Sequence, residues 1–118
     1  MASLVDKVGS LLPLESGERI LCAAYVPASG TSIGSAVIAV SDRRLLFAPR
    51  SAFLSVGAWA SRQLSDVRIK SSRRRSGFTV THRFEIVDAD GSALVFEFER
   101  REAGDFRKAI GRRLAPGP

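Results

Sequence analysis

Apolar and polar side chains alternate through residues 78–98 on both sides of one sharp turn, and this alternation constrains the fold more than any other feature. A period of two is typical of β-strands whose two faces meet different surroundings. The turn has the sequence VDADGS, which predicts a three-residue loop, 89–91, with Gly91 in the left-handed conformation. The register that follows places His82, Phe84 and Ile86 across from Phe98, Phe96 and Leu94 on one inner face, and Arg83 across from Glu97.

The stretch KSSRRRSG, residues 70–77, predicts a second hairpin in front of the first. We expect Arg73, Arg74 and Arg75 to occupy its tip, where a charged turn stays in water. In this register Arg68, Lys70, Thr79 and Thr81 point outward, while Val67, Ile69 and Ser71 pair inward with His82, Val80 and Phe78. Both hairpins then select the same inner face, so each prediction supports the other.

Shorter apolar runs predict further strands towards the N-terminus. Their ranges are 18–26, 35–41, 44–49 and 56–64, and a strand at 67–71 leads into the hairpin. Trp59 falls within the fourth of these strands, and we expect its large side chain to belong to the core. Cys22 is the only cysteine and lies in the first strand, which predicts a buried thiol in a reducing compartment.

A helical period replaces the period of two at both ends of the chain. Residues 1–12 predict a helix that Ser3 and Asp6 cap and Pro13 ends, and residues 101–114 predict a longer amphipathic helix. The apolar positions are Leu4, Val8, Leu11 and Leu12 in the first helix and Ala103, Phe106, Ala109, Ile110 and Leu114 in the second. We expect the first helix to dock on the domain; a membrane-surface anchor is the alternative.

Together these elements predict a mainly β (α+β) fold. We expect roughly seven antiparallel strands in a barrel or sandwich, closed by the C-terminal α-helix and preceded by the short N-terminal helix. A chain of 118 residues suffices for one such domain. The expected organisation is an N-terminal amphipathic helix at 1–13, one β domain at 14–114 and a tail at 115–118.

The net charge of +6 and the isoelectric point near 10.7 predict a surface that attracts phosphates, acidic lipids or acidic proteins. No apolar run approaches the roughly 20 residues that a membrane-spanning helix needs. The first residues also lack the layout of a secretion signal. We therefore expect a cytoplasmic protein, either free or peripherally attached to the inner face of the membrane.

The chain resembles the pleckstrin-homology-like superfamily, in particular the small bacterial PH-like and GRAM-like domains. The resemblance lies in LESGERIL, AVSDRRLLF, Trp59 and DFRKAIGRRL, and it spans residues 14–114. It implies a PH-like barrel that recognises lipids, peptides or scaffold proteins. Lipid-binding relatives grip phosphoinositide heads with basic residues of the first hairpin loop, whereas the matching loop here, PASGTSIG, contains no Lys or Arg. Other relatives bind lipid between that loop and the loop of the fifth and sixth strands, which matches Arg73, Arg74 and Arg75.

Two groups of basic residues are candidate binding sites. The first group, from the hairpin, is Arg68, Lys70, Arg73, Arg74 and Arg75, and it is either an anion- or partner-binding patch or a solvated hairpin tip. The second group, from the last helix, is Arg101, Arg107, Lys108 and Arg112, with Arg100 and Arg113 beside them. Cations near a helix C-terminus also compensate the helix dipole, which is the alternative explanation for Arg112 and Arg113.

Few residues offer chemistry. His82 is the only histidine, and we expect a hydrogen-bonded residue of the core or its rim instead of a metal ligand or a catalytic base. GTSIG at 30–34 matches the G-x-S-x-G pattern of hydrolases, but a strand follows it, so Ser32 is expected to be a loop residue. No glycine-rich phosphate loop is present in the sequence. We therefore expect no enzyme, no cofactor and no metal.

The expected function is recognition without catalysis, by a PH-like adaptor module that binds a protein partner or peptide. Addition of a peptide to a sheet edge is a plausible mode. The alternative is peripheral binding to anionic phospholipid head groups through Arg68–Arg75. Nucleic-acid binding is less favoured, because most aromatic residues fall on the inner face and no known nucleic-acid-binding signature occurs. The sequence leaves the partner's identity and the oligomeric state open.

Overall fold

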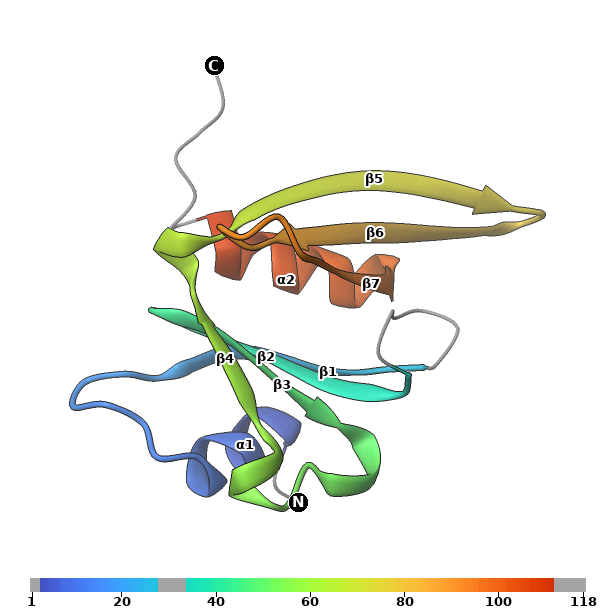
Figure 1. Ribbon diagram of the computed structural model, residues 1–118. Coiled ribbons are helices and arrows are strands. Elements are labelled where there is room, and N and C mark those ends of the chain that lie inside the picture. The colour runs from blue at the N-terminus through green and yellow to red at the C-terminus, as the bar shows by residue number, and fades with distance from the viewer. Residues whose placement is uncertain (1–2, 28–33, 112–118) are drawn as a thin grey trace.

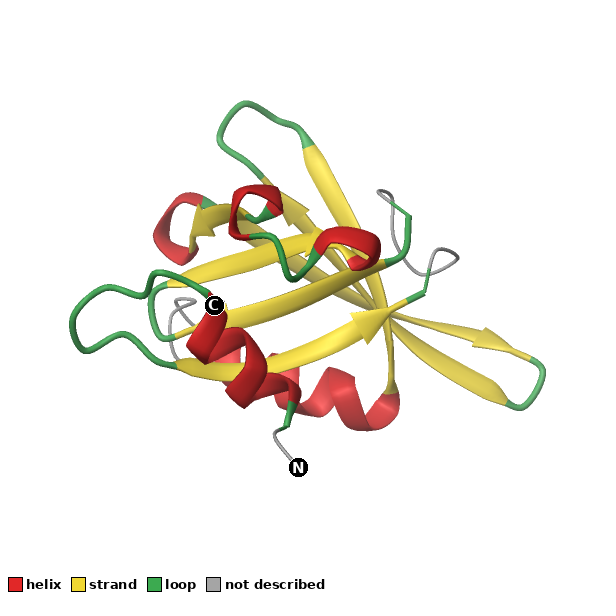
Figure 2. Cartoon of the chain, turned by 90° about the horizontal axis from the view of Figure 1, so that it is seen from below, coloured by secondary structure: helices red, strands yellow, loops and turns green. Residues whose placement is uncertain are grey.

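Two antiparallel sheets and two helices make up residues 3–27 and 34–111, the part of the chain that the computed structural model describes (Figures 1 and 2). The first sheet has the order β1-β2-β3-β4 and the second the order β5-β6-β7. The predicted mainly β fold with two helices is therefore confirmed. The described residues form no closed barrel, because β4 and β5 belong to separate sheets. The elements are α1 (Leu4–Leu11), β1 (Ile20–Val26), β2 (Ala36–Ser41), β3 (Arg44–Pro49), β4 (Ala60–Gln63), β5 (Arg68–Ser76), β6 (Thr79–Val87), β7 (Ala93–Glu99) and α2 (Arg100–Gly111).

Helix α1 covers the outer face of the four-stranded sheet, as expected of a docking helix. Ser3 caps it by accepting a hydrogen bond from the backbone N–H of Asp6 at 3.2 Å. Val8 and Leu12 are buried against Val37 and Leu46 of the sheet. Strand β2 is buried along its whole length, because α1 covers one of its faces and the second sheet with α2 covers the other.

The region around Trp59 differs from its prediction as a core strand. The expected strand at 56–64 is shorter, since Val56–Ala58 forms a 3₁₀ turn and β4 begins at Ala60. Trp59 is half-buried, packs against the α1 side of the sheet, and its indole Nε1 donates to the Phe53 carbonyl at 2.6 Å. It therefore belongs to the outer cluster and not to the main core.

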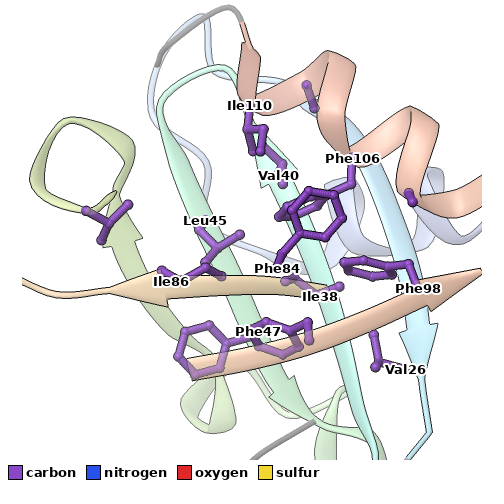
Figure 3. Packing of buried hydrophobic residues seen from close by; sticks show 14 of the residues in the cluster. Val26, Ile38, Val40, Leu45, Phe47, Phe84, Ile86, Phe98, Phe106 and Ile110 are labelled. Atoms are coloured by element: carbon purple, nitrogen blue, oxygen red, sulfur yellow. The ribbon is translucent and has the colours of Figure 1, made fainter. Parts of the chain in front are cut away.

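The main core lies between the two sheets and is built around phenylalanine rings (Figure 3). Phe106 of α2 packs on Phe84 of β6 and Phe98 of β7, with ring centroids 4.7 and 5.0 Å away. Phe47 of the first sheet meets Phe96 of the second at 6.1 Å. All five rings are at most 7% exposed. The helix is thus held by aromatic packing, which offsets the low helix propensity of its glycines.

The predicted register of the β6–β7 hairpin is confirmed. His82 lies opposite Phe98, Phe84 opposite Phe96, and Arg83 opposite Glu97. The backbone N–H of Asp88 donates to the Ser92 carbonyl at 2.8 Å, which encloses the expected three-residue loop. Gly91 adopts φ +89°, the left-handed conformation that the loop requires.

The predicted register of the β5–β6 hairpin is wrong. Ser71 pairs with Phe84 instead of Phe78, and Arg73 pairs with His82. The turn consists of Gly77 and Phe78, with Gly77 at φ +59°, so the three arginines belong to strand β5 and not to its tip. A glycine accepts this left-handed backbone at low cost, whereas an arginine resists it. The pairing partner of each β5 residue is displaced along β6 by an even number of residues. Because side chains alternate between the two faces of a strand, His82, Phe84 and Ile86 still face inward.

A buried ion pair joins the start of β1 to the β2–β3 turn. The Glu18 carboxylate is fully buried and accepts two hydrogen bonds from Arg44, each 2.9 Å long. It also accepts hydrogen bonds from the Ser41 hydroxyl at 2.6 Å and from the backbone N–H of Glu15 at 3.0 Å. The Arg44 guanidinium lowers the pKa of Glu18 from 4.5 to about 2. The segments LESGERIL and SDRRLLF therefore form one structural contact.

We predict that this ion pair makes stability depend on pH in the acid range. Because the pKa of Glu18 is lower in the folded chain, its contribution is complete above pH 4.5 and is lost as the pH falls towards 2. Glu18→Gln should lower the free energy of unfolding by on the order of 3 kcal/mol at pH 7, and by much less near pH 2. Urea unfolding at several pH values measures this difference. A difference that stays constant from pH 7 to pH 2 would contradict the assignment.

We also predict that two phenylalanines, one in helix α2 and one at the β5–β6 turn, contribute very differently to the free energy of unfolding. Phe106→Ala should lower the free energy of unfolding by about 3 to 5 kcal/mol, because it removes a ring from the packed core. Phe78→Ala should change it by about 0.5 kcal/mol or less, since the Phe78 side chain is fully exposed. Chemical denaturation followed by circular dichroism compares the two. Equal losses would show that the core is arranged differently.

Candidate functional site

The β5–β6 hairpin projects beyond the rest of the molecule (Figures 1 and 2). Strand β7 ends at Glu99, opposite Thr81, so the residues between Arg75 and Val80 form a ribbon of only two strands. Phe78 at the turn is 107% exposed, and Val80 is also exposed. Both had been expected on the buried face, and the correct register explains why they are not. Phe78 and Val80 lie beyond the end of the core, which covers this face of β6 only from His82 onwards.

The predicted hairpin patch is divided between the two faces of the second sheet. Arg73 and Arg75 share the inner face with their partners His82 and Val80. Arg68 and Lys70 lie on the outer face, opposite Val87 and Glu85. All four of these cations are exposed, and the Arg74 side chain lies outside the described part. The inner face of the ribbon therefore combines two arginines with two exposed apolar residues.

The cations of α2 are also divided. Arg100 and Arg107 lie seven residues apart, which places them on the same flank of the helix. The Arg107 guanidinium lies 5.7 Å from the centre of the Phe84 ring, so this flank faces β6. The helical period turns Arg101 and Lys108 away from it, and Arg112 lies outside the described residues. The cations predicted as a second patch on α2 therefore do not form one continuous surface.

The two groups of basic residues meet at His82. This residue is only 7% exposed, and its Nδ1 atom has no hydrogen-bond partner among the described residues. The pKa of His82 is lowered by burial first, and then by the positive charges of Arg107, Arg73 and Arg100. Sequence reasoning expected a hydrogen-bonded histidine and separate basic patches. The glycine at position 77 was the one signal that could have set the register that brings Arg73 to His82.

The other flank of α2 is acidic and faces β1. Glu102 and Asp105 line a groove there together with Cys22. Burial raises the pKa of Glu102, and the charges of Glu99 and Asp105 raise it further. Burial and Asp105 raise the pKa of Cys22 to about 11, so its half-buried thiol stays protonated at neutral pH. A protonated thiol is a poor nucleophile.

Metal ligands do not gather anywhere in residues 3–27 and 34–111. No group of three His, Cys, Asp or Glu side chains is close enough there to hold an ion. Across the same ranges, neither helix has the length and apolar character needed to cross a bilayer. Ser32 of the GTSIG segment lies outside the described residues. Within the described chain, the candidate site is therefore the cationic surface around His82 and the ribbon next to it.

No protein-family model matches the chain, and no curated protein sequence matches it. A functional assignment thus depends on the cations, the exposed Phe78 and the buried His82 themselves.

Proposed function

We propose that the chain is a non-enzymatic docking module that binds an anionic membrane surface through the β5–β6 hairpin. The observation that carries the proposal is Phe78, which stands fully exposed at the turn with Arg73 and Arg75 behind it on the ribbon. An apolar tip with a cationic base suits the membrane interface, where the ring enters the acyl boundary and the arginines stay among the headgroups.

The energies of such an interaction are modest. Transfer of a phenylalanine ring out of water yields about 2 kcal/mol, and each cation near an anionic surface adds about 1 kcal/mol. Phe78 with Arg73 and Arg75 therefore supplies about 4 kcal/mol, which corresponds to a dissociation constant near 1 mM. Attachment through this surface alone is reversible and weakens with salt. A second contact, such as the cations of α2, is needed for stable binding.

The PH-like resemblance is consistent with this proposal. The order of a four-stranded sheet, a three-stranded sheet and a C-terminal helix supports a PH-like fold in which α2 covers the opening between the sheets. The sequence of the first hairpin loop has no basic residue, so the usual phosphoinositide grip is missing. The β5–β6 hairpin is then the surface of the fold best suited to acidic headgroups.

A protein partner is the second candidate, and the free edge of β5 favours it. Strand β5 runs for nine residues, and within the described residues it pairs only with β6, so its other edge offers backbone donors and acceptors. Arg73 and Arg75 on this strand select for an acidic segment. A peptide that adds to this edge does not require the exposed ring of Phe78, and this difference separates the two candidates.

We predict that the chain sediments with phosphatidylcholine vesicles that contain anionic lipid at low salt, and less so at high salt. Phe78→Ser should weaken this binding by roughly tenfold or more, because a polar side chain gains nothing at the acyl boundary. The double variant Arg73→Gln/Arg75→Gln should weaken it by roughly 30-fold.

The matched control is Arg68→Gln/Lys70→Gln, which removes the same charge from the outer face of the same strand. It should weaken vesicle binding by roughly threefold or less, since these side chains lie away from the tip. If both double variants lost the same amount of vesicle binding, the binding would depend on the net charge of the protein and not on the position of the arginines. Unchanged binding by Phe78→Ser would exclude insertion of the tip and leave the edge of β5 as the better candidate.

A further inference from the structure

We propose that Arg73, Arg100 and Arg107 form a binding site for a phosphomonoester group beside His82. This inference deepens the proposed function and depends on it for the source of the phosphate, a lipid headgroup. The site lies at the base of the ribbon, where β5, β6 and the first two turns of α2 come together. The site shares Arg73 with the ribbon, whereas Phe78 belongs to the tip alone, so Phe78→Ser tests the tip without removing a residue of the site.

Three elements of the fold position the three arginines. The register of β5 and β6 sets Arg73 directly opposite His82 on the inner face. Helix α2 begins directly after Glu99, which lies opposite Thr81, so Arg100 starts the helix two residues after Phe98, the partner of His82. Two helical turns later, Arg107 lies with its guanidinium 5.7 Å from the Phe84 ring centre, two residues along β6 from His82. The three arginines thus surround the histidine from a strand and a helix.

Arg73, Arg100 and Arg107 belong to none of the ion pairs resolved among the described side chains, which are those of Arg43, Arg44 and Arg62. On β7, Phe98 faces His82, while Glu97 and Glu99 alternate with it on the opposite face. On α2, Glu102 and Asp105 occupy the flank that faces β1. Three exposed guanidinium groups near one buried polar side chain are an arrangement that an anion stabilises.

His82 adds a buried polar group to the site. Its Nδ1 atom is shielded from solvent and has no hydrogen-bond partner among the described residues, which is costly unless a ligand or a proton compensates. Burial lowers the pKa of His82, and the positive charges of Arg107, Arg73 and Arg100 lower it further, so both favour the neutral imidazole. A bound dianion offsets these charges, so it favours protonation of His82. Phosphate binding and proton uptake by His82 are therefore coupled, so a bound phosphate raises the pKa of His82.

The charge of the site favours a phosphomonoester over a phosphodiester. Three guanidinium groups match a phosphate that carries up to two negative charges, and planar guanidinium groups bind such oxygens in pairs. A diester headgroup carries one charge and two of its oxygens are esterified. The ligand class is therefore a terminal phosphate, borne by a lipid headgroup or free in solution.

His82 is the only histidine of the chain, so its imidazole signals report on this site without overlap from other histidines. The experiment titrates the intact, histidine-labelled protein with inorganic phosphate, at constant ionic strength adjusted with chloride, and follows His82 by NMR over a range of pH. We expect phosphate to raise the pKa of His82 with a saturating dependence on concentration. An unchanged titration curve of His82 in phosphate would overturn the inference.

Variants separate a specific site from general screening. Arg73→Gln and Arg107→Gln should each weaken the phosphate dependence by roughly tenfold or more, because each removes a charged donor. Arg101→Gln removes the same charge from the solvent side of the same helix and should leave the phosphate dependence unchanged. An equal response of all three variants would mean that phosphate only screens the surface. Circular dichroism and thermal unfolding verify that each variant is folded.

Vesicles distinguish the source of the phosphate and separate this inference from the proposed function. Vesicles with phosphatidic acid, a phosphomonoester, should shift His82 more than vesicles of equal surface charge made with phosphatidylglycerol, a diester. Phe78→Ser should lose the vesicle response and keep the response to free phosphate. Vesicle binding without any response of His82 to phosphate would refute the site alone. A phosphate response without vesicle binding would retain the site for free phosphate and refute the membrane role.

Discussion

The packing of Phe106 on Phe84 and Phe98 is the contact on which the functional surface depends. It presses one face of α2 onto the second sheet, with ring centroids 4.7 and 5.0 Å apart. The orientation of the helix follows from this contact, because a helix that buries one face must present its two flanks to its neighbours. One flank carries Arg100 and Arg107 to β6, and the other carries its acidic residues to β1. The same rings that stabilise the fold therefore direct Arg107 to β6, and Glu102 and Asp105 to β1.

The β5–β6 ribbon is exposed on both faces because β7 ends at Glu99, opposite Thr81. A strand pair with a third strand and a helix beneath it buries its inner face, as His82 and Phe84 show. Beyond Thr81 the third strand is missing, and the same alternation continues without a cover. Arg75 and Val80 are then exposed on a face that is core elsewhere, and Phe78 completes it at the turn. A two-stranded extension is marginal by itself, so a partner surface that covers it stabilises it.

Local sequence patterns predicted most of the fold, since helices, helix caps and glycine turns depend on residues that are close together in the sequence. The Ser3 cap, the loop closed by Gly91 and the inner face of β6 were all predictable for this reason. The position of the β5–β6 turn was not predictable in this way. The run of three arginines has the charge that is typical of an exposed turn, whereas the actual turn is set by Gly77, which adopts the left-handed backbone conformation. The approach of Arg73, Arg100 and Arg107 to His82 depends on long-range packing, so no local pattern could predict it. The Glu18–Arg44 pair likewise joins residues far apart in the sequence.

We propose that the β5–β6 hairpin, together with the start of α2, is the surface that meets an acidic partner. Hydrogen–deuterium exchange of the intact chain, with and without vesicles that contain phosphatidic acid, tests this claim most directly, because a two-stranded ribbon exchanges readily when it is uncovered. We predict that vesicles slow exchange in residues 72–82 and in the first turn of α2, with β1 to β4 unchanged. Slower exchange confined to the four-stranded sheet, with residues 72–82 unaffected, would contradict it.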